Sequence, residues 1–187
     1  MDLPLYIKNI AKLTAENEEE LKEVFKREEF PKGHFLYKQG DICRQIFYIE
    51  KGFARVYYYS KSGKEISTWF PFENSFTVAI DSFYQHTPTL YNCRLLEKSV
   101  VYSMKHSDFE NMTNKYPEFS KFAFKVTYGI AKRLSEFIVN TKFQTAEERF
   151  NALMQEYPLI FQRASLVHIA SYLGITKETL SRIRAGK

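Results

Sequence analysis

Two helix signals separated by one glycine, near the carboxyl end, constrain the fold more than any other feature of the sequence. Ser165 can cap a first helix, and Gly174 can take the positive φ that ends a helix tightly. Thr176 can then cap a second helix after a short turn. The inward face of the two helices would consist of Leu166, Ile169, Ala170, Leu173, Leu180 and Ile183. This pattern predicts a helix-turn-helix, in which the small Ala170 lets two steeply crossing helices approach closely.

The second predicted helix has a polar outer face. Glu178 and Arg182 are four residues apart, so they lie on one side of the helix and can enter the same groove. A carboxylate can accept from a cytosine amino group, and a guanidinium can bridge two acceptors on guanine. With Ser181 they are predicted to read bases, whereas phosphate contacts are expected from Lys177, Thr179 and Arg184. The competing interpretation is a solvent-exposed helix with an internal Glu–Arg pair.

The positive charge of the chain is concentrated at the same end. The formal net charge is +5 for 187 residues, and residues 157–187 hold five Lys or Arg side chains against the one carboxylate of Glu178. A basic end on a nearly neutral body suits a polyanionic partner, because phosphate binding releases counterions. Charge alone does not distinguish this from a solvated basic tail.

The first half of the chain predicts a different architecture. Gly33, Gly40, Gly52 and Gly63 punctuate short runs rich in Tyr, Phe, Ile and Val. These runs cover residues 35–37, 46–49, 53–59, 66–70 and 99–104. Such β-formers between turn residues are typical of consecutive antiparallel strands, and several short strands favour a sandwich or a jelly-roll barrel. A short helix is expected before them, over residues 18–26.

A helix of more than twenty residues is predicted between these two parts. Pro117 suits its first turn, and apolar residues then recur in steps of three and four. The stripe consists of Phe119, Phe122, Val126, Ile130, Leu134 and Phe137. A single stripe is either core packing or the seam between two copies of the helix, and we favour a homodimer interface. The chain then divides into a β-roll (1–106), a linker and dimerisation helix (107–142) and a helix-turn-helix domain (143–187).

In the order of these parts the chain resembles the Crp/Fnr family of transcription factors, which includes the cyclic-AMP receptor protein and the fumarate–nitrate regulator. The most specific part is Glu178-Thr-Leu-Ser181-Arg182, which looks like the family's recognition-helix signature. The resemblance implies an α+β fold: a cyclic-nucleotide-binding-like β-roll (jelly roll), a dimerisation helix and a winged-helix-like helix-turn-helix domain. Residues 157–165 leave little room for the wing itself.

The same resemblance implies a function. A homodimer would bind a palindromic double-stranded DNA site and regulate transcription, with Glu178, Ser181 and Arg182 reading a TTGA- or TGTGA-like half-site. Two recognition helices would then lie about one DNA turn, roughly 34 Å, apart. RNA polymerase and a small-molecule effector of unknown identity are further candidate partners.

The chain departs from the family at the ligand-binding motifs. Members that bind cyclic nucleotides carry a Gly-Glu-Leu segment and an Arg-Ser/Thr-Ala motif around the phosphate and ribose. Here residues 72–79 read Phe-Glu-Asn-Ser-Phe-Thr-Val-Ala, and Thr89 takes the place of the arginine. Without that glycine and arginine a phosphate is poorly held, so no cyclic nucleotide is expected.

No other cofactor is evident from the sequence and no metal is expected, but a single histidine as a haem ligand stays an open alternative. Cys43 and Cys93 are too few to hold an iron–sulfur cluster or a four-coordinate structural zinc by themselves. The four histidines are scattered and show no ligand spacing. They are His34, His86, His106 and His168.

Two further expectations follow from motifs that the sequence lacks. Enzymatic activity is not expected, because there is no Gly-x-Ser-x-Gly elbow and Cys93 has no evident His partner. Neither a secretory signal nor an apolar run long enough to span a bilayer is present, which predicts a cytoplasmic protein. The alternative function is a β-roll sensory or interaction module whose terminal helices bind protein rather than DNA.

Overall fold

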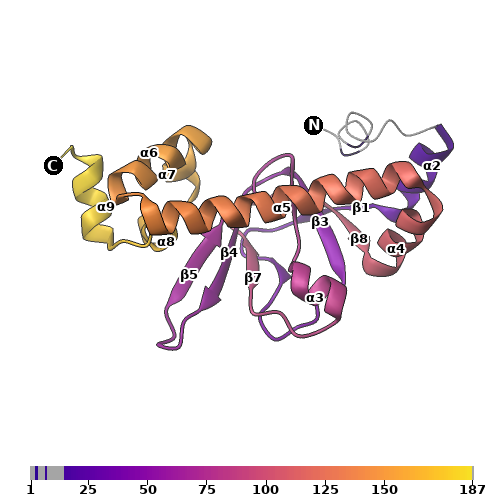
Figure 1. The fold of residues 1–187 in the computed structure, drawn as a ribbon, viewed down its shortest axis with the longest axis horizontal. Helices are drawn as coiled ribbons and strands as arrows, with labels where there is room; N and C mark the ends of the chain where they lie inside the picture. The colour runs from indigo at the N-terminus through magenta and orange to yellow at the C-terminus, as the bar shows by residue number, and fades with distance from the viewer. Residues whose placement is uncertain (1–2, 4–6, 8–14, 187) are drawn as a thin grey trace.

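The computed structural model describes Leu3, Ile7 and residues 15–186. The described elements form, in chain order, a β-roll, a long helix and a cluster of short helices, as the sequence predicted (Figure 1). The long helix, α5 (Pro117–Phe143), runs the length of the molecule, with the β-roll along one side and the C-terminal helices at one end. Within the described residues, no helix is both long enough and apolar enough to cross a bilayer.

The β-roll consists of two antiparallel four-stranded sheets in the described part of the chain. One sheet has the order β1-β8-β3-β6 and the other the order β2-β7-β4-β5. The strands are β1 (Lys26–Phe30), β2 (Phe35–Tyr37), β3 (Gln45–Lys51), β4 (Ala54–Tyr59), β5 (Glu65–Trp69), β6 (Ser75–Thr77), β7 (Asn92–Leu95) and β8 (Ser99–Lys105). All five predicted strands are confirmed, each to within two residues at its ends.

Strands β1, β6 and β7 and helix α3 (Ile80–Gln85) were not predicted from the sequence. The helix expected over residues 18–26 ends earlier, because α2 is Ala15–Val24 and Lys26 already belongs to β1. The charged pentapeptide of β1 can be a strand because it is a sheet edge, and its register runs along β8 from Lys26↔Ser103 to Phe30↔Ser99. This pairing joins segments far apart in the sequence, so local propensity does not show it.

Strand β3 lies between two cores because its side chains alternate between the two faces of its sheet. Phe47 and Ile49 point between the sheets and pack in the interior of the β-roll. Ile46 and Tyr48 point to the other face, which α4 (His106–Lys115) and the first turns of α5 cover. The long helix is therefore fixed to the β-roll at its amino-terminal end.

The first part of the apolar stripe predicted as the dimer seam faces the interior of the chain itself. Phe119 and Phe122 are 0% and 1% exposed and belong to the core that covers the outer face of the first sheet. The prediction that they form the dimer interface is therefore wrong. Farther along the stripe, Val126, Ile130 and Phe137 are half-buried and Leu134 is exposed. An apolar period marks the face that is buried, but it does not say whether the same chain or a second copy buries it.

The opposite face of α5 carries large apolar side chains that are exposed. Phe124, Tyr128 and Ile138 are 70%, 60% and 53% exposed, and the first two stack with ring centroids 6.3 Å apart. Ala131, also exposed, lies between them along the helix. At the helical period the four residues fall within a sector of about 80°. We refer to Phe124, Tyr128, Ala131 and Ile138 as the outer face of α5.

Candidate nucleic-acid interface

Four short helices follow α5 in the described part of the C-terminal segment, and no strand occurs among residues 144–186. They are α6 (Ala146–Glu156), α7 (Ile160–Arg163), α8 (Leu166–Leu173) and α9 (Lys177–Arg184). Helix α6 begins with a capping box, in which the Thr145 hydroxyl accepts from the Glu148 N–H and the Glu148 carboxylate accepts from the Thr145 N–H. Helix α7 lies within residues 157–165, the segment that the sequence showed to be too short for a wing.

The turn between α8 and α9 forms as the sequence predicted. Ser165 Oγ accepts from the His168 N–H at 3.3 Å, and Thr176 Oγ1 accepts from the Thr179 N–H at 3.2 Å. Gly174 has φ 67°, and its N–H and the next one bond back to carbonyls at the end of α8. Each signal acts over three to five residues, which is why the sequence alone reveals it.

The inward sides of α8 and α9 are buried in a core that also includes the β-roll. Ile169, Ala170, Leu173 and Leu180 are all buried, as predicted. They join Leu153, Tyr157 and Ile160 of the preceding helical segment and Phe53 and Phe70 of the β-roll. The helix-turn-helix is therefore packed against the β-roll by a shared apolar cluster, which the sequence did not predict.

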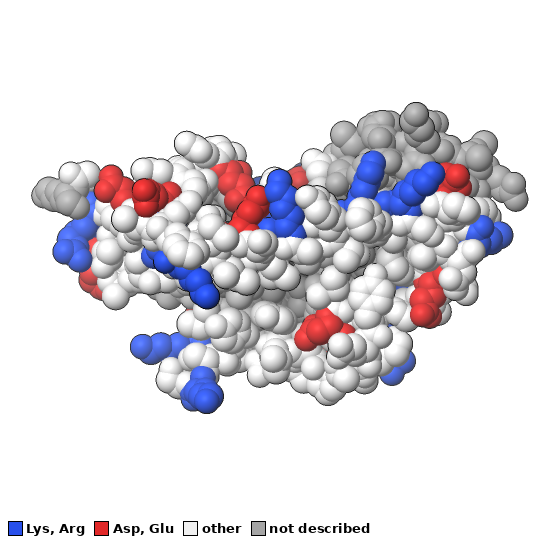
Figure 2. Space-filling view, viewed as in Figure 1, with Lys and Arg blue, Asp and Glu red and all other residues white. Residues whose placement is uncertain are grey.

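The outward side of α9 brings the predicted base-reading residues together. Glu178, Ser181 and Arg182 are exposed, and Arg182 Nη2 donates to Thr179 Oγ1 at 3.3 Å. Hydrogen bonds from its own backbone N–H and from the Thr176 hydroxyl hold the pKa of the Glu178 carboxyl below its usual value. At neutral pH it is an ionised acceptor. Lys and Arg side chains are visible at this end of the molecule (Figure 2).

The three residues predicted to contact phosphates differ in their surroundings. Lys177 is exposed in the first turn of α9. Thr179 is half-buried, and its hydroxyl lies 3.1 Å from that of Thr176. The Arg184 guanidinium lies over the Phe161 ring, 4.4 Å from its centroid. Of the three, Lys177 is the most freely available to a phosphate.

Helix α8 is hydrogen-bonded to the edge strand β5. The Ser67 N–H donates to Ser171 Oγ at 3.0 Å, and the Ser171 hydroxyl donates to the Glu65 carbonyl at 2.8 Å. The Ser67 hydroxyl donates to the His168 carbonyl at 3.0 Å. Groups that an edge strand would leave unpaired are thus bound by α8, so the edge is covered.

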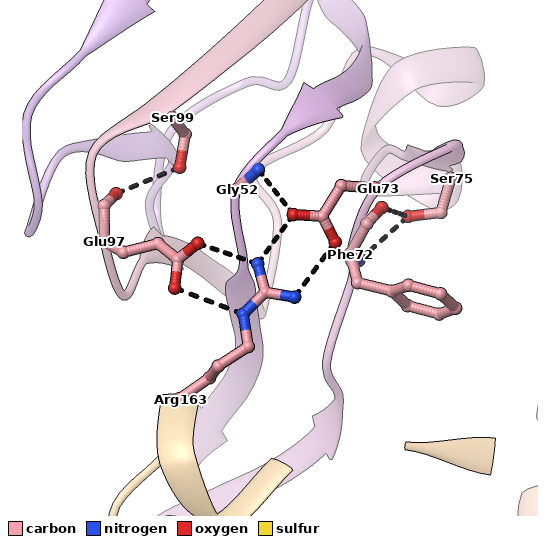
Figure 3. Close-up of polar contacts among 7 residues, drawn as sticks. All are labelled: Gly52, Phe72, Glu73, Ser75, Glu97, Ser99 and Arg163. Atoms are coloured by element: carbon pink, nitrogen blue, oxygen red, sulfur yellow. Dashed lines mark hydrogen bonds and ion pairs between the residues drawn. The ribbon is translucent and has the colours of Figure 1, made fainter. Parts of the chain in front are cut away.

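Arg163, at the end of α7, forms a second polar link to the β-roll (Figure 3). Its Nη1 and Nη2 bind the two oxygens of Glu73 at 2.9 and 2.7 Å, and its Nε and Nη2 bind Glu97 at 3.2 and 2.7 Å. Glu73 also accepts from the Gly52 N–H at 2.9 Å. Gly52 has φ 128°, and a Cβ there would meet Ser99 at 2.1 Å, so only glycine fits this position.

These bonds decide the charge of the cluster. Burial raises the pKa of Glu73, but the bonds from Arg163 and Gly52 outweigh it and hold the pKa below its usual value. Burial lowers the pKa of Arg163, but the two carboxylates outweigh that and raise it further above neutrality. Glu73 and Arg163 are therefore both charged at neutral pH. Only the tertiary structure shows the cluster, because Arg163 lies 90 residues from Glu73.

Replacing Arg163 by Met should lower the free energy of unfolding at pH 7 by about 1–3 kcal/mol, since it leaves two half-buried carboxylates without their cation. Glu73 has a lowered folded-state pKa, so its contribution is present above the unfolded pKa and is lost as the pH falls through the folded value. The difference between the two proteins should therefore shrink in acid. Urea unfolding from pH 7 to 3 measures it, with Arg163→Lys as the charge-retaining control. A difference that stays constant with pH would contradict the role of the ion pairs.

Several residues at the positions of the family's nucleotide motifs have buried side chains. Ala79 and Thr89 are buried, and Thr89 Oγ1 accepts from the Tyr91 N–H at 3.1 Å. Inside the β-roll, the hydroxyls of Tyr37 and Thr77 are 3.0 Å apart. These side chains occupy space between the sheets, and none of them supplies the cation that a buried phosphate needs.

The two cysteines are buried and free. Burial raises the pKa of the Cys43 thiol, and it raises that of Cys93 to about 12. Both are therefore protonated at neutral pH and are weak nucleophiles and poor metal ligands. Among the described residues, no group of three or more His, Cys, Asp or Glu is placed to hold a metal ion.

Comparisons with known proteins agree on the fold. A family model described as "Cyclic nucleotide-binding domain" matches residues 27–116. The fumarate and nitrate reduction regulatory protein of Escherichia coli K12 is 25% identical over 186 residues, which cover 89% of this chain and 72% of that protein. The structure of FixK2 from Bradyrhizobium japonicum superposes with a TM-score of 0.76 at 17% identity, covering 87% of this chain and 84% of FixK2. A crp/fnr family regulator from Eubacterium rectale has a TM-score of 0.74 at 13% identity, covering 97% of this chain and 87% of that protein.

Proposed function

We propose that the chain is a transcription regulator of the Crp/Fnr family and that it binds specific DNA sequences through α9; the comparisons and the geometry above support this proposal. One observation carries the proposal. Glu178, Ser181 and Arg182 share the exposed face of a helix whose start is fixed by the Thr176 cap and whose inner face is anchored by the buried Leu180. Such a helix can enter a major groove with its side chains already positioned.

Each residue of this face has a role that suits its chemistry. Ionised Glu178 accepts from a cytosine amino group, Arg182 donates to the O6 and N7 of guanine, and Ser181 bonds to either kind of edge. Lys177, Thr179 and Arg184 contact phosphates and fix the orientation of the helix. Arg184 reaches a phosphate by leaving its position over Phe161.

The protein acts as a homodimer on a palindromic site, and the outer face of α5 forms the dimer interface. Phe124, Tyr128 and Ile138 present a row of exposed apolar side chains that a second copy of the helix would cover. Val126, Ile130 and Phe137 are half-buried against their own chain, so they flank this interface rather than form it. Two copies of α9 then reach successive major grooves, roughly 34 Å apart.

Selection from a random DNA pool, followed by titration of one variant, tests the proposal. We expect a palindrome to be recovered, and Arg182→Ala to cost about 1–3 kcal/mol on that site and to relax the preference at one base pair per half-site. Lys38→Ala, which removes an exposed cation from the β-roll, is the control and should bind as the parent does.

Other outcomes identify other functions. An equal loss on every sequence with Arg182→Ala would make Arg182 a phosphate contact instead of a base reader. DNA binding should also weaken steeply as salt rises, because counterions are released. No enrichment of any duplex, together with salt-insensitive binding of a protein partner, would overturn the proposal in favour of a protein-interaction module.

A further inference from the structure

A cavity of about 240 Å³ lies where the β-roll meets the first helix of the helix-turn-helix. Arg55 of β4, Glu65 of β5 and Arg94 of β7 line it from the β-roll, together with Lys32 from the loop before β2. His168 of α8 lines it from the other side. The β-roll and α8 therefore both line this cavity, and these five residues come from five separate segments.

Positive charge predominates in this cavity. Arg55 is only 3% exposed, and its guanidinium donates to Ser67 Oγ and to the carboxylate of Glu65. Arg94 donates to the Gly33 carbonyl, and Lys32 is exposed. Neither of these two forms an ion pair with any carboxylate that the structure describes. Three cations thus line the cavity beside one carboxylate: Arg55 is buried and paired with Glu65, whereas Arg94 and Lys32 are exposed.

His168, which lines the same cavity, carries a polar atom without a partner in the part of the chain that the structure describes. Its Nδ1 is buried and has no hydrogen-bond partner among the described residues. Its Nε2 lies 4.0 Å from the Glu65 carboxylate, which is too long for a direct hydrogen bond. Burial and the charges of Arg55 and Arg94 lower the pKa of His168, and Glu65 opposes them. At neutral pH the imidazole is therefore uncharged, and a nearby anion would favour its protonation.

We propose that this cavity binds a small metabolite anion that carries phosphate or carboxylate groups. The volume lies just below the roughly 300–1,000 Å³ of pockets for drug-sized ligands, so it suits a small anion better than a dinucleotide. Arg94 and Lys32 supply charge-assisted donors, and the buried Arg55 contributes a fixed positive charge. His168 offers a further donor once it is protonated.

Such a ligand would bridge the two domains. His168 is on α8, and α8 is held to β5 by the bonds of Ser67 and Ser171. An anion that binds only when α8 is docked on β5 would stabilise this docked conformation relative to any conformation in which α8 has left β5. The regulatory meaning of the site rests on the proposed DNA binding, whereas anion binding itself does not.

Calorimetry of the full chain against inorganic phosphate and, separately, succinate tests the site at a constant ionic strength held with sodium chloride. We expect saturable binding of at least one of the two anions, and this comparison distinguishes a phosphate ligand from a dicarboxylate. Arg94→Gln and Lys32→Gln should each weaken binding roughly 10-fold, the effect of losing one charge-assisted contact. Lys61→Gln, an exposed cation in the β4–β5 turn outside the cavity, should leave the affinity unchanged. Arg55 is left intact because its removal threatens folding.

A second measurement locates the anion. The imidazole signals of His168, followed by NMR across pH, should report a higher pKa when the anion is bound. The proposal is overturned if neither anion saturates, if Arg94→Gln and Lys32→Gln bind as the parent does, or if the pKa of His168 does not rise.

Titration of the selected DNA with and without the anion tests the regulatory part. A change in DNA affinity that Arg94→Gln abolishes supports it, and an unchanged affinity overturns it while the anion site stands. Anion binding by a protein that binds no DNA would leave the site intact and refute the proposed function instead.

Discussion

Replacing both Phe124 and Ile138 by Asp should convert the proposed dimer to a monomer and weaken binding to the proposed palindromic site by roughly 10²- to 10⁴-fold, the advantage of engaging two half-sites at once. The two side chains are 70% and 53% exposed in the single chain, so the substitutions leave its own core untouched. In a dimer joined along the outer face of α5, each Asp would be an unpaired charge in an apolar interface. Sedimentation velocity measures the mass, and titration of full and half sites measures the affinity.

The control for this prediction is a charge change on the same helix away from the outer face. Glu136→Lys changes an exposed position whose surface pair with Lys132 contributes little to stability. It should leave both the mass and the affinity close to those of the parent. A double Asp variant that remains a dimer would contradict the outer-face interface and place the contact elsewhere on the molecule.

Phe119→Ala should lower the free energy of unfolding by about 3–5 kcal/mol, because it opens a cavity in a filled core. Phe119 is 0% exposed and packs against Phe109 and Phe122, with ring centroids 5.6 and 5.3 Å away. The measurement is best made in the monomeric double Asp background, since dissociation of a dimer would otherwise contribute to the apparent stability. Urea unfolding followed by circular dichroism gives the value.

Phe143→Ala is the matched control for this second prediction. This substitution removes the same kind of side chain from the same helix, but Phe143 is 80% exposed. The free energy of unfolding should therefore change by no more than about 0.5 kcal/mol. If Phe119→Ala cost as little as Phe143→Ala, and instead dissociated the parent dimer, the stripe that contains Phe119 would be the dimer seam after all.

The helix-turn-helix could be predicted almost completely from the sequence. Ser165, Gly174 and Thr176 act through hydrogen bonds or backbone angles within a few residues, and the structure has all three as expected. The exposed set on α9 followed from helical spacing once the helix was known. Because these signals are local, no knowledge of the rest of the fold was needed.

The attachment of this motif to the β-roll could not be predicted in the same way. Arg163 binds carboxylates 90 and 66 residues away, and Ser67 binds Ser171 across 104 residues. Strands β1, β6 and β7 likewise form by pairing with distant partners. Their sequences are short and polar, so the hydrophobic period that reveals a half-buried strand is missing. The basic cavity between the β-roll and α8 depends on the same long-range arrangement.

Helix α5 shows most clearly which properties the sequence determines and which the tertiary structure determines. Its sequence alone determined that residues after Pro117 form one continuous helix with an apolar stripe, because periodicity and a proline at the first turn are properties of the helix itself. Apolar residues also lie on its other side, and only the tertiary structure decided which side is inside. The β-roll and α4 cover Phe119 and Phe122 and leave Phe124 and Tyr128 in solvent. Whether a side chain is buried depends on which other elements pack against it, and only the tertiary structure determines those neighbours.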